Sequence, residues 1–134
     1  MEQTLIIIKP DGVKRKLIGE VIRRIERKNL QVVEAKLIMP SEDLIKEHYK
    51  EHSEKSFYNE LIEFFTSGKA MALVVEGENA IPIMRLLVGE TDPLRALPGT
   101  IRGDFALSKT QNIVHASYSA ESASREINLW FGQV

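Results

Sequence analysis

Stretches typical of strands alternate with stretches typical of helices along this chain, and this alternation limits its fold more than any other feature of the sequence. Thr4 to Ile8 and Ala70 to Val75 are short apolar runs bounded by proline, glycine or charged residues, which is typical of buried strands. From Ile18 onward, apolar residues recur three and four positions apart, as in an amphipathic helix. The alternation favours a sheet covered by helices over a helical bundle or an all-β fold.

Further elements follow from the same patterns. Alternation with a period of two from Val33 to Met39 predicts another strand. Spacing of three and four predicts helices over residues 42–49, 57–65, 80–88 and 120–130. Ser41 is a suitable cap for the first of these helices, and Ser117 or Ser119 for the last. We expect short strands at residues 105–107 and 112–115, and a long ordered loop at residues 89–103.

The composition bounds the class of protein. The chain has 134 residues, and we expect residues 1–134 to form a single domain. Eighteen Lys and Arg residues against nineteen Asp and Glu residues leave a net charge of −1, so no overall basic field favours nucleic acid or an anionic membrane as a partner. There is no cysteine, and no apolar run approaches the roughly 20 residues that span a bilayer. We therefore expect a soluble cytoplasmic protein.

The loop at residues 89–103 is where the sequence indicates an anion site. A Walker loop and the usual zinc-binding motifs are absent from the chain. Guanidinium and hydroxyl groups instead surround the glycines of this loop: Arg85, Thr91, Arg95, Thr100 and Arg102. Such a set of donors suits a polyanion such as a triphosphate. In the alternative interpretation, the arginines pair with acidic residues of the same segment, namely Glu90, Asp92 and Asp104.

His115 is the residue best suited to nucleophilic chemistry. It follows the apolar stretch that begins at Asn112, where a strand would open into a turn, and Glu126 lies downstream on the closing helix. A neutral imidazole attacks phosphorus through one nitrogen, while a carboxylate bonded to the other nitrogen fixes the tautomer and stabilises the developing charge. In the alternative interpretation, His115 is structural. His48 lies on an apolar helical stripe and is expected to be a packed core or rim histidine.

Several motifs together resemble those of nucleoside diphosphate kinases. They are Ile8-Lys-Pro-Asp-Gly-Val13, His48-Tyr49, Gly89-Glu-Thr91, Pro98-Gly-Thr-Ile-Arg-Gly-Asp-Phe105, Asn112-Ile-Val-His115, Ser122-Ala-Ser-Arg-Glu126 and Trp130-Phe131. The resemblance implies a ferredoxin-like α/β (α+β) sandwich with a four-stranded antiparallel sheet covered by helices. It also implies a phosphotransferase that moves the terminal phosphoryl group of a nucleoside triphosphate, typically ATP, to a nucleoside diphosphate by a ping-pong mechanism with little base specificity.

The resemblance also implies catalytic roles. His115 matches the family nucleophile, which would carry the phosphoryl group as a phosphohistidine. Glu126 matches the carboxylate that orients this histidine, and Ser117 matches the hydroxyl that links the two. Tyr49 matches the phenol beside the transferred phosphoryl group, and Lys9 completes the expected catalytic set.

Substrate-binding roles are implied in the same way. The residues that match phosphate contacts are Arg85, Thr91 and Arg102, those that match ribose contacts are Lys9 and Asn112, and Phe57 matches the aromatic that stacks on the base. A stacked ring reads no base edge, which explains how such a site accepts all nucleosides. Mg²⁺ in this family is carried on the nucleotide phosphates, so no protein ligand for a metal is expected. The implied partners are nucleoside di- and triphosphates and further copies of the chain, with a hexamer favoured and a tetramer possible.

The sequence departs from the family pattern beside the nucleophile. The family has His-Gly-Ser-Asp-Ser where this chain has His115-Ala-Ser-Tyr-Ser119, so Tyr118 replaces a carboxylate. One alternative function is therefore a nucleotide sensor or scaffold in which Tyr118 has reduced turnover. Another is an RNA-binding module with a ferredoxin-like fold, although the strands lack exposed aromatic pairs and the net charge is −1.

Overall fold

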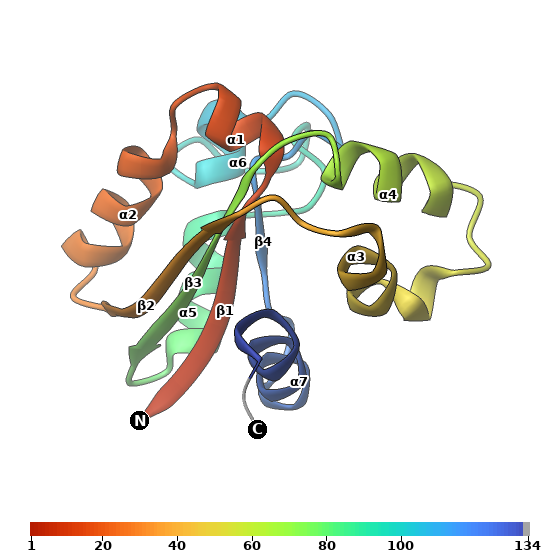
Figure 1. The fold of residues 1–134 in the computed structure, drawn as a ribbon. Helices are drawn as coiled ribbons and strands as arrows, with labels where there is room; N and C mark the ends of the chain where they lie inside the picture. The colour runs from red at the N-terminus through yellow and green to blue at the C-terminus, as the bar shows by residue number, and fades with distance from the viewer. Residues whose placement is uncertain (133–134) are drawn as a thin grey trace.

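The computed structural model describes residues 1–132, and a four-stranded sheet forms its centre (Figure 1). The strands are β1 (Glu2–Ile8), β2 (Gln31–Ile38), β3 (Ala70–Gly77) and β4 (Val114–Ala116), in the spatial order β2-β3-β1-β4. All neighbouring strands are antiparallel. The α-helices are α1 (Pro10–Lys14), α2 (Ile18–Arg27), α3 (Glu42–His48), α4 (Tyr58–Phe65), α5 (Ala80–Val88), α6 (Ile101–Phe105) and α7 (Ala120–Phe131), and a 3₁₀ helix, η1 (Lys50–His52), lies between α3 and α4.

The strand order is that of the predicted ferredoxin-like sandwich. The units β1-α2-β2 and β3-α5-β4 each place two strands parallel to one another with a strand of the other unit between them. Helices α3, η1 and α4 are inserted between β2 and β3 and extend away from the sheet, as Figure 1 shows. The predicted fold class is confirmed.

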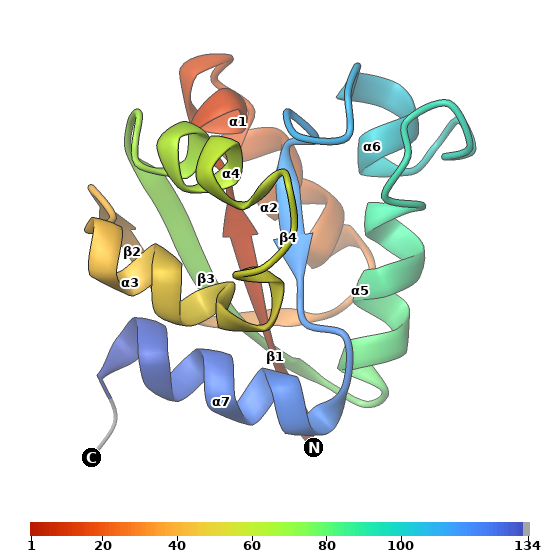
Figure 2. The same ribbon diagram turned by 90° about the vertical axis from the view of Figure 1, so that its right-hand side faces the viewer.

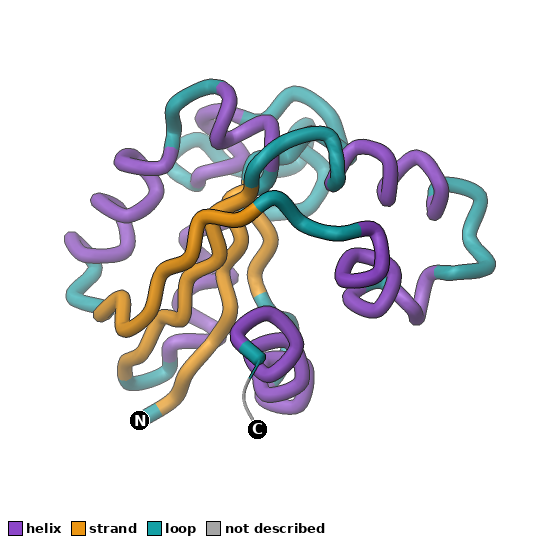
Figure 3. The backbone as a smooth tube through the Cα atoms, viewed as in Figure 1, coloured by secondary structure: helices purple, strands orange, loops and turns teal. Residues whose placement is uncertain are grey.

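Helices cover both faces of the sheet (Figures 2 and 3). Successive side chains of β1 point to opposite faces, so Ile6 and Ile8 pack in the core under α2 and α5, whereas Leu5 and Ile7 pack in the core under α7, α3 and α4. All four side chains are fully buried. This explains why the first strand is a continuous apolar run rather than an alternating one. Among the described residues, no helix is both long and apolar enough to cross a membrane.

Side-chain caps fix where two of the helices begin. Ser41 accepts a hydrogen bond from the backbone N–H of Leu44 at 3.1 Å and starts α3, as predicted. Helix α7 begins after Ser119, which forms a capping box with Ser122. The cap is therefore Ser119 and not Ser117, and Ser117 remains available for the site described below.

The segment before β4 differs most from the sequence-based expectation. The strand predicted at residues 105–107 does not form, because the Thr100 hydroxyl accepts a hydrogen bond from the N–H of Gly103 and starts α6, which runs through Phe105. Helix α6 also means that the loop predicted at residues 89–103 ends at Thr100.

The last strand begins two residues later than predicted. Ile113 has a φ of 73°, a left-handed conformation that is rare for a β-branched residue. Its N–H donates to the Asp11 carboxylate at 3.0 Å, and its carbonyl accepts from the N–H of Lys9 at 2.8 Å. The strand pairing therefore starts only at Val114, and the Lys-Pro-Asp-Gly segment holds the bend that precedes it.

Candidate active site

The predicted site residues surround one pocket of about 950 Å³ beside β4. Most of them line it: Lys9, Tyr49, Phe57, Arg85, Thr91, Arg102, Asn112, His115 and Glu126. Ser117, Arg95 and Thr100 are not among its lining residues, and the Thr100 hydroxyl caps α6 instead. Residues far apart in the sequence meet here because the central strand β1 and the edge strand β4 are covered on this side by α3 and α7, as Figure 2 shows. The pocket is within the size range of small-molecule sites.

The position of His115 follows from strand register. His115 lies directly opposite Ile7 in the antiparallel pair of β4 and β1, so both side chains are on the face covered by α3 and α7. Nε2 of His115 is 2.9 Å from Oε1 of Glu126, which α7 presents from its second turn. Because a carboxylate is an acceptor, Nε2 carries the proton and Nδ1 keeps its lone pair.

Ser117 connects this pair to the sheet. Its hydroxyl donates to the same Glu126 oxygen at 2.7 Å and accepts from the N–H of Leu5 at 3.3 Å. Ser117 is completely buried, behind the pocket wall and outside the pocket itself. The Glu126 oxygen thus receives two hydrogen bonds, and its position is tied to β1 through Ser117.

Electrostatics keep the imidazole neutral and the carboxylate charged. Burial is the main effect on His115 and lowers its pKa below the usual value, against the opposing influence of Glu126. The pKa of Glu126 is also lowered, because its hydrogen bonds from His115 and Ser117 outweigh desolvation. A neutral histidine with a free Nδ1 is the reactive form for attack on phosphorus.

Two arginines supply positive charge to the pocket without carboxylate partners. Arg85 donates to the carbonyl of Ala116 at 3.2 Å, and Arg102 donates to the carbonyls of Gly89 and Val114 at 3.0 and 2.8 Å. Burial and the neighbouring Arg85 lower the pKa of Arg102 to about 10, so Arg102 remains a cation at neutral pH.

The alternative interpretation of the arginine loop is wrong for these two residues. Within residues 1–132, neither Glu90 nor Asp92 forms an ion pair, and Asp104 pairs with Arg24 at 2.7 Å. Asp104 also accepts from the N–H of Gly99 at 2.9 Å, which fixes the turn before α6. Asp104, together with Asp92, which accepts from the N–H of Leu94 at 3.0 Å, therefore stabilises the loop, and Arg85 and Arg102 have no carboxylate partner among the described residues.

Lys9 and Asn112 form a polar pair on the pocket floor. Nζ of Lys9 donates to the side-chain oxygen of Asn112 at 2.8 Å, and both residues are buried. Burial, followed by repulsion from Arg102, lowers the pKa of Lys9 to about 7, and Asp11 only partly offsets this shift. The protonation of Lys9 is thus poised near physiological pH.

The remaining predicted residues lie at different depths. The phenol of Tyr49 is enclosed near Glu126, and burial raises its pKa above the usual value, so it stays a neutral donor. Thr91 is exposed on the loop that follows α5. Phe57 stands at the entrance with 45% of its side chain exposed, and the Lys55 ammonium lies 5.9 Å from its ring centroid.

Sequence reasoning missed the part that His48 plays in the pocket wall. His48 is buried, as predicted, but its ring lies 4.6 Å from that of His115 and receives a hydrogen bond from Trp130. A signal was present, because Trp130 follows Glu126 by four residues and so lies on the same face of the closing helix. The pocket also includes charged residues that we did not predict, namely Glu51, Lys109, Glu121 and Arg125.

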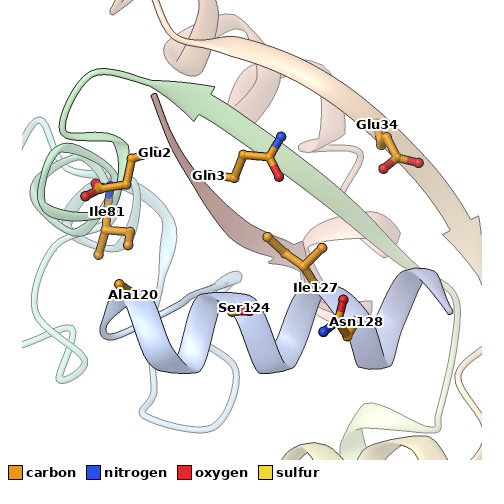
Figure 4. A pocket seen from close by; sticks show the side chains of 8 residues that line it. All are labelled: Glu2, Gln3, Glu34, Ile81, Ala120, Ser124, Ile127 and Asn128. Atoms are coloured by element: carbon orange, nitrogen blue, oxygen red, sulfur yellow. The ribbon is translucent and has the colours of Figure 1, made fainter. Parts of the chain in front are cut away.

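A second, smaller pocket of about 470 Å³ lies near the other end of β1 (Figure 4). Glu2 lines it but is used structurally, because its carboxylate accepts from the N–H of Ile81 in the first turn of α5 at 2.8 Å. Gln3 donates to Glu76 at 3.0 Å. Among the described residues, no arginine, lysine or histidine lines this pocket, so it lacks the positively charged donors that attract an anionic substrate.

The chain is similar to known proteins along nearly its whole length. The sequence model of the family described as nucleoside diphosphate kinase matches residues 2–134. The chain belongs to the nucleoside diphosphate kinase family. A nucleoside diphosphate kinase of Macrococcus caseolyticus is 57% identical over 131 residues, which cover 98% of this chain and 88% of the relative. One from Thermoanaerobacter sp. is 56% identical, covering 100% of this chain and 99% of the relative.

Solved structures of nucleoside diphosphate kinases share the fold. The structure from Encephalitozoon cuniculi superposes with a TM-score of 0.97 at 43% identity and covers 99% of this chain and 90% of that one. The structure of a family protein from Babesia bovis superposes with a TM-score of 0.94 at 50% identity, covering 98% of this chain and 88% of that one. Family membership therefore stands on both sequence and structure.

Proposed function

We propose that this chain transfers the terminal phosphoryl group of a nucleoside triphosphate, typically ATP, to a nucleoside diphosphate, and that His115 carries the group between the two. In the first half-reaction, Nδ1 of His115 forms a bond to the γ-phosphorus as the bond from phosphorus to the β,γ-bridging oxygen breaks, and the diphosphate leaves with that oxygen. In the second, a terminal oxygen of another diphosphate attacks the same phosphorus and releases neutral His115. This is a ping-pong sequence.

Glu126 and Ser117 are assigned to the support of the nucleophile. The phosphorylated imidazole gains positive charge while its Nε2 proton remains bonded to Glu126, 2.9 Å away in the free protein. Ser117 holds the carboxylate in place. Tyr49 would donate a hydrogen bond to the transferred phosphoryl group from the pocket wall.

Phosphate binding is assigned to Arg85, Thr91 and Arg102, and ribose binding to Lys9 and Asn112. The two arginines support this assignment because no carboxylate neutralises them among the described residues. The same basic surroundings suit Mg²⁺ carried on the nucleotide phosphates better than Mg²⁺ held by protein carboxylates. The substrate would therefore be a magnesium–nucleotide complex.

Base binding is assigned to Phe57, whose half-exposed ring stands at the pocket entrance. Stacking tolerates every base because each base has a π-face. This supports the low base specificity that we propose.

The observation that carries the proposal is the hydrogen bond between His115 and Glu126 beside two unneutralised arginines. ATP with a radiolabelled γ-phosphate should label the protein in the absence of an acceptor, and the label should move to added GDP or CDP. His115→Ala should abolish labelling. Stable phosphate on the His115→Ala protein would contradict the assignment.

The RNA-binding alternative loses support from the fold. Modules that bind single-stranded RNA on a sheet leave one face open for bases to stack on aromatic side chains. Here helices cover both faces (Figure 1). We propose no role for nucleic acid, and cytoplasmic localisation stays a prediction.

We also propose that the protein is a homo-oligomer, with a hexamer favoured over a tetramer. Strand β2 is at the edge of the sheet and exposes Val33 and Leu37, and Leu94 and Leu97 are exposed on the loop before α6. An apolar sheet edge is a surface that natural proteins usually cover. Size-exclusion chromatography with light scattering gives the number of subunits, and a monomer at micromolar concentration would contradict the proposal.

A further inference from the structure

Trp130 determines which nitrogen of His48 carries a proton. The indole N–H of Trp130 lies 2.9 Å from Nδ1 of His48, and both residues are buried. An indole nitrogen is only a donor, so Nδ1 of His48 must offer its lone pair. The proton of neutral His48 is therefore on Nε2.

A second proton on His48 would break this arrangement. The cationic form carries N–H groups on both nitrogens, which would bring the Nδ1–H of His48 against the N–H of Trp130. The surroundings of His48 also disfavour its cationic form. Burial lowers the pKa of His48 well below its usual value, and basic side chains that face it add to this effect: His115 from β4, Arg125 from α7, Lys9 after β1 and His52 from η1. Tyr49 packs against the ring and remains neutral, and the carboxylate of Glu126 places a negative charge nearby.

In this neutral tautomer, His48 has no free nitrogen lone pair with which to bind a metal ion or attack phosphorus. One nitrogen is bonded to Trp130, and the other, Nε2, carries a proton, is closed to solvent and has no hydrogen-bond partner in the described part of the chain. His48, His115 and Glu126 each place a potential ligand atom within 4.8 Å of the others, as a metal site would. A metal needs an unprotonated nitrogen, however, so the bond from Trp130 argues against that role.

The locked ring borders the nucleophile directly. The ring centroids of His48 and His115 are 4.6 Å apart, and their planes meet at 77°, an edge-to-face contact. Trp130 itself packs edge-to-face on His48 at 5.7 Å. His115 is thus held by Glu126 at one edge and by the ring of His48 at its side, and both supports depend on α7.

We propose that His48, fixed by Trp130 as a neutral tautomer, is a positioning residue that holds the imidazole of His115 in the orientation for phosphoryl transfer. The inference rests on the proposed function of His115. It also explains why the phosphoryl group would reside on one histidine of a closely packed pair: His115 has a free lone pair and His48 has none.

The tautomer is tested in the unmodified protein by ¹⁵N NMR of its histidines. His48 should show the Nε2–H form without titrating between about pH 5.5 and 8. In Trp130→Phe, which keeps an aromatic ring in the core, His48 should become a mixture of tautomers and begin to titrate. An Nδ1–H form in the unmodified protein, or titration of His48 in that range, would overturn the inference whatever the variants do.

The positioning role is tested by the rate of His115 phosphorylation in a single turnover. In His48→Asn, the side-chain oxygen can still accept from Trp130, but the ring beside His115 is gone. We expect this rate to fall about ten- to a hundredfold, as small misplacements of a reacting group do, with little change in KM for ATP. Trp130→Phe should slow phosphorylation mainly at acidic pH, where His48 can gain a proton.

The outcomes separate the inference from the proposed function. If the unmodified protein forms phosphohistidine and His48→Asn, folded by circular dichroism, does so at the same rate, the positioning role is wrong and the function stands. If the unmodified protein takes no label from ATP, the function itself fails. A rise in KM without a change in the phosphorylation rate would assign His48 to substrate binding and would also overturn the positioning role.

Discussion

The guanidinium of Arg85 lies over the ring of Tyr118, with its central carbon 4.9 Å from the ring centroid. Tyr118 is 79% exposed and stands where the resemblance to the family implies a carboxylate, so Arg85 has a neutral π-face beside it in place of an opposite charge. The contact therefore holds the guanidinium of Arg85 in place without a carboxylate beside it.

This contact predicts how Tyr118→Asp behaves. A carboxylate beside Arg85 would neutralise part of the charge that attracts the nucleotide, and it would also repel the phosphates directly. We expect a modest rise in KM for ATP at low salt that shrinks at about 1 M salt, while His115 is still phosphorylated. Tyr118→Phe, which keeps the π-face, is the matched control and should behave as the unmodified protein does.

Two other results of the same experiment would be informative. Tighter ATP binding by Tyr118→Asp at low salt would show that Tyr118 acts through packing or through the start of α7. Normal nucleotide affinity with turnover near background in the unmodified protein, restored by Tyr118→Asp, would favour a nucleotide sensor.

Glu126→Gln isolates the charge of the carboxylate from its shape. Glutamine keeps an oxygen that can accept from His115, but it cannot balance the positive charge of the phosphorylated imidazole. A hydrogen bond to a charged group contributes about 1.5–3 kcal/mol, so the phosphorylation rate should fall about ten- to a hundredfold. Ser117→Ala removes one neutral donor and should cost less, which rapid-quench measurements on both variants would reveal. Equal rates for Glu126→Gln and the unmodified protein would remove Glu126 from the mechanism.

Phe57→Ala tests how bases are bound. If Phe57 only stacks, the variant should raise KM for purine and pyrimidine substrates together, by about 1–3 kcal/mol of lost binding, with purines affected somewhat more. Steady-state kinetics with ATP, GTP, CTP and UTP as donors would measure this. A loss confined to one base would mean that another group reads the base edges.

The lowered pKa of Lys9 predicts that the protein takes up protons when nucleotide binds. Its pKa is lowered to about 7 in the free protein, so at about pH 8 most of the population is neutral. A bound polyanion favours the charged form and raises the pKa, so protons are taken up. Calorimetry in buffers of different ionisation enthalpy should show this uptake near pH 8 and little at about pH 5.5, where Lys9 is already charged. Lys9→Met should remove the pH-dependent part, and an uptake that persists in Lys9→Met would assign it to another group.

The sequence predicted those helices and strands whose residue pattern depends only on burial and on neighbouring residues. The apolar run of β1 and the cap of α3 at Ser41 could be predicted because each depends on neighbours in the sequence. The start of β4 could not, because Ile113 is held in its left-handed conformation by Asp11, about 100 residues earlier, within hydrogen-bonding distance only in the folded chain.

In the candidate site, too, residue types could be predicted from the sequence, whereas contacts between distant segments could not. The residue types around His115 indicated phosphoryl chemistry, and the combined motifs indicated the family. Whether Arg85 and Arg102 were paired with acids was open in the sequence, since the pairing of Asp104 with Arg24 depends on how α2 packs beside α6. The bond between Trp130 and His48 likewise joins two helices that the sequence does not place side by side.

Helix α7 cannot vary in length, because its start is fixed by the capping box at Ser119 and because Glu126 and Trp130 must stay four residues apart. Successive helical residues are rotated by about 100°, so one residue inserted or deleted between Glu126 and Trp130 would turn one of them away from the histidine that it contacts. One change between Ser119 and Glu126 would turn both away from their histidines. Substitutions on the outer face of α7 leave these contacts in place, so this helix can diverge in composition but has no freedom to gain or lose a residue.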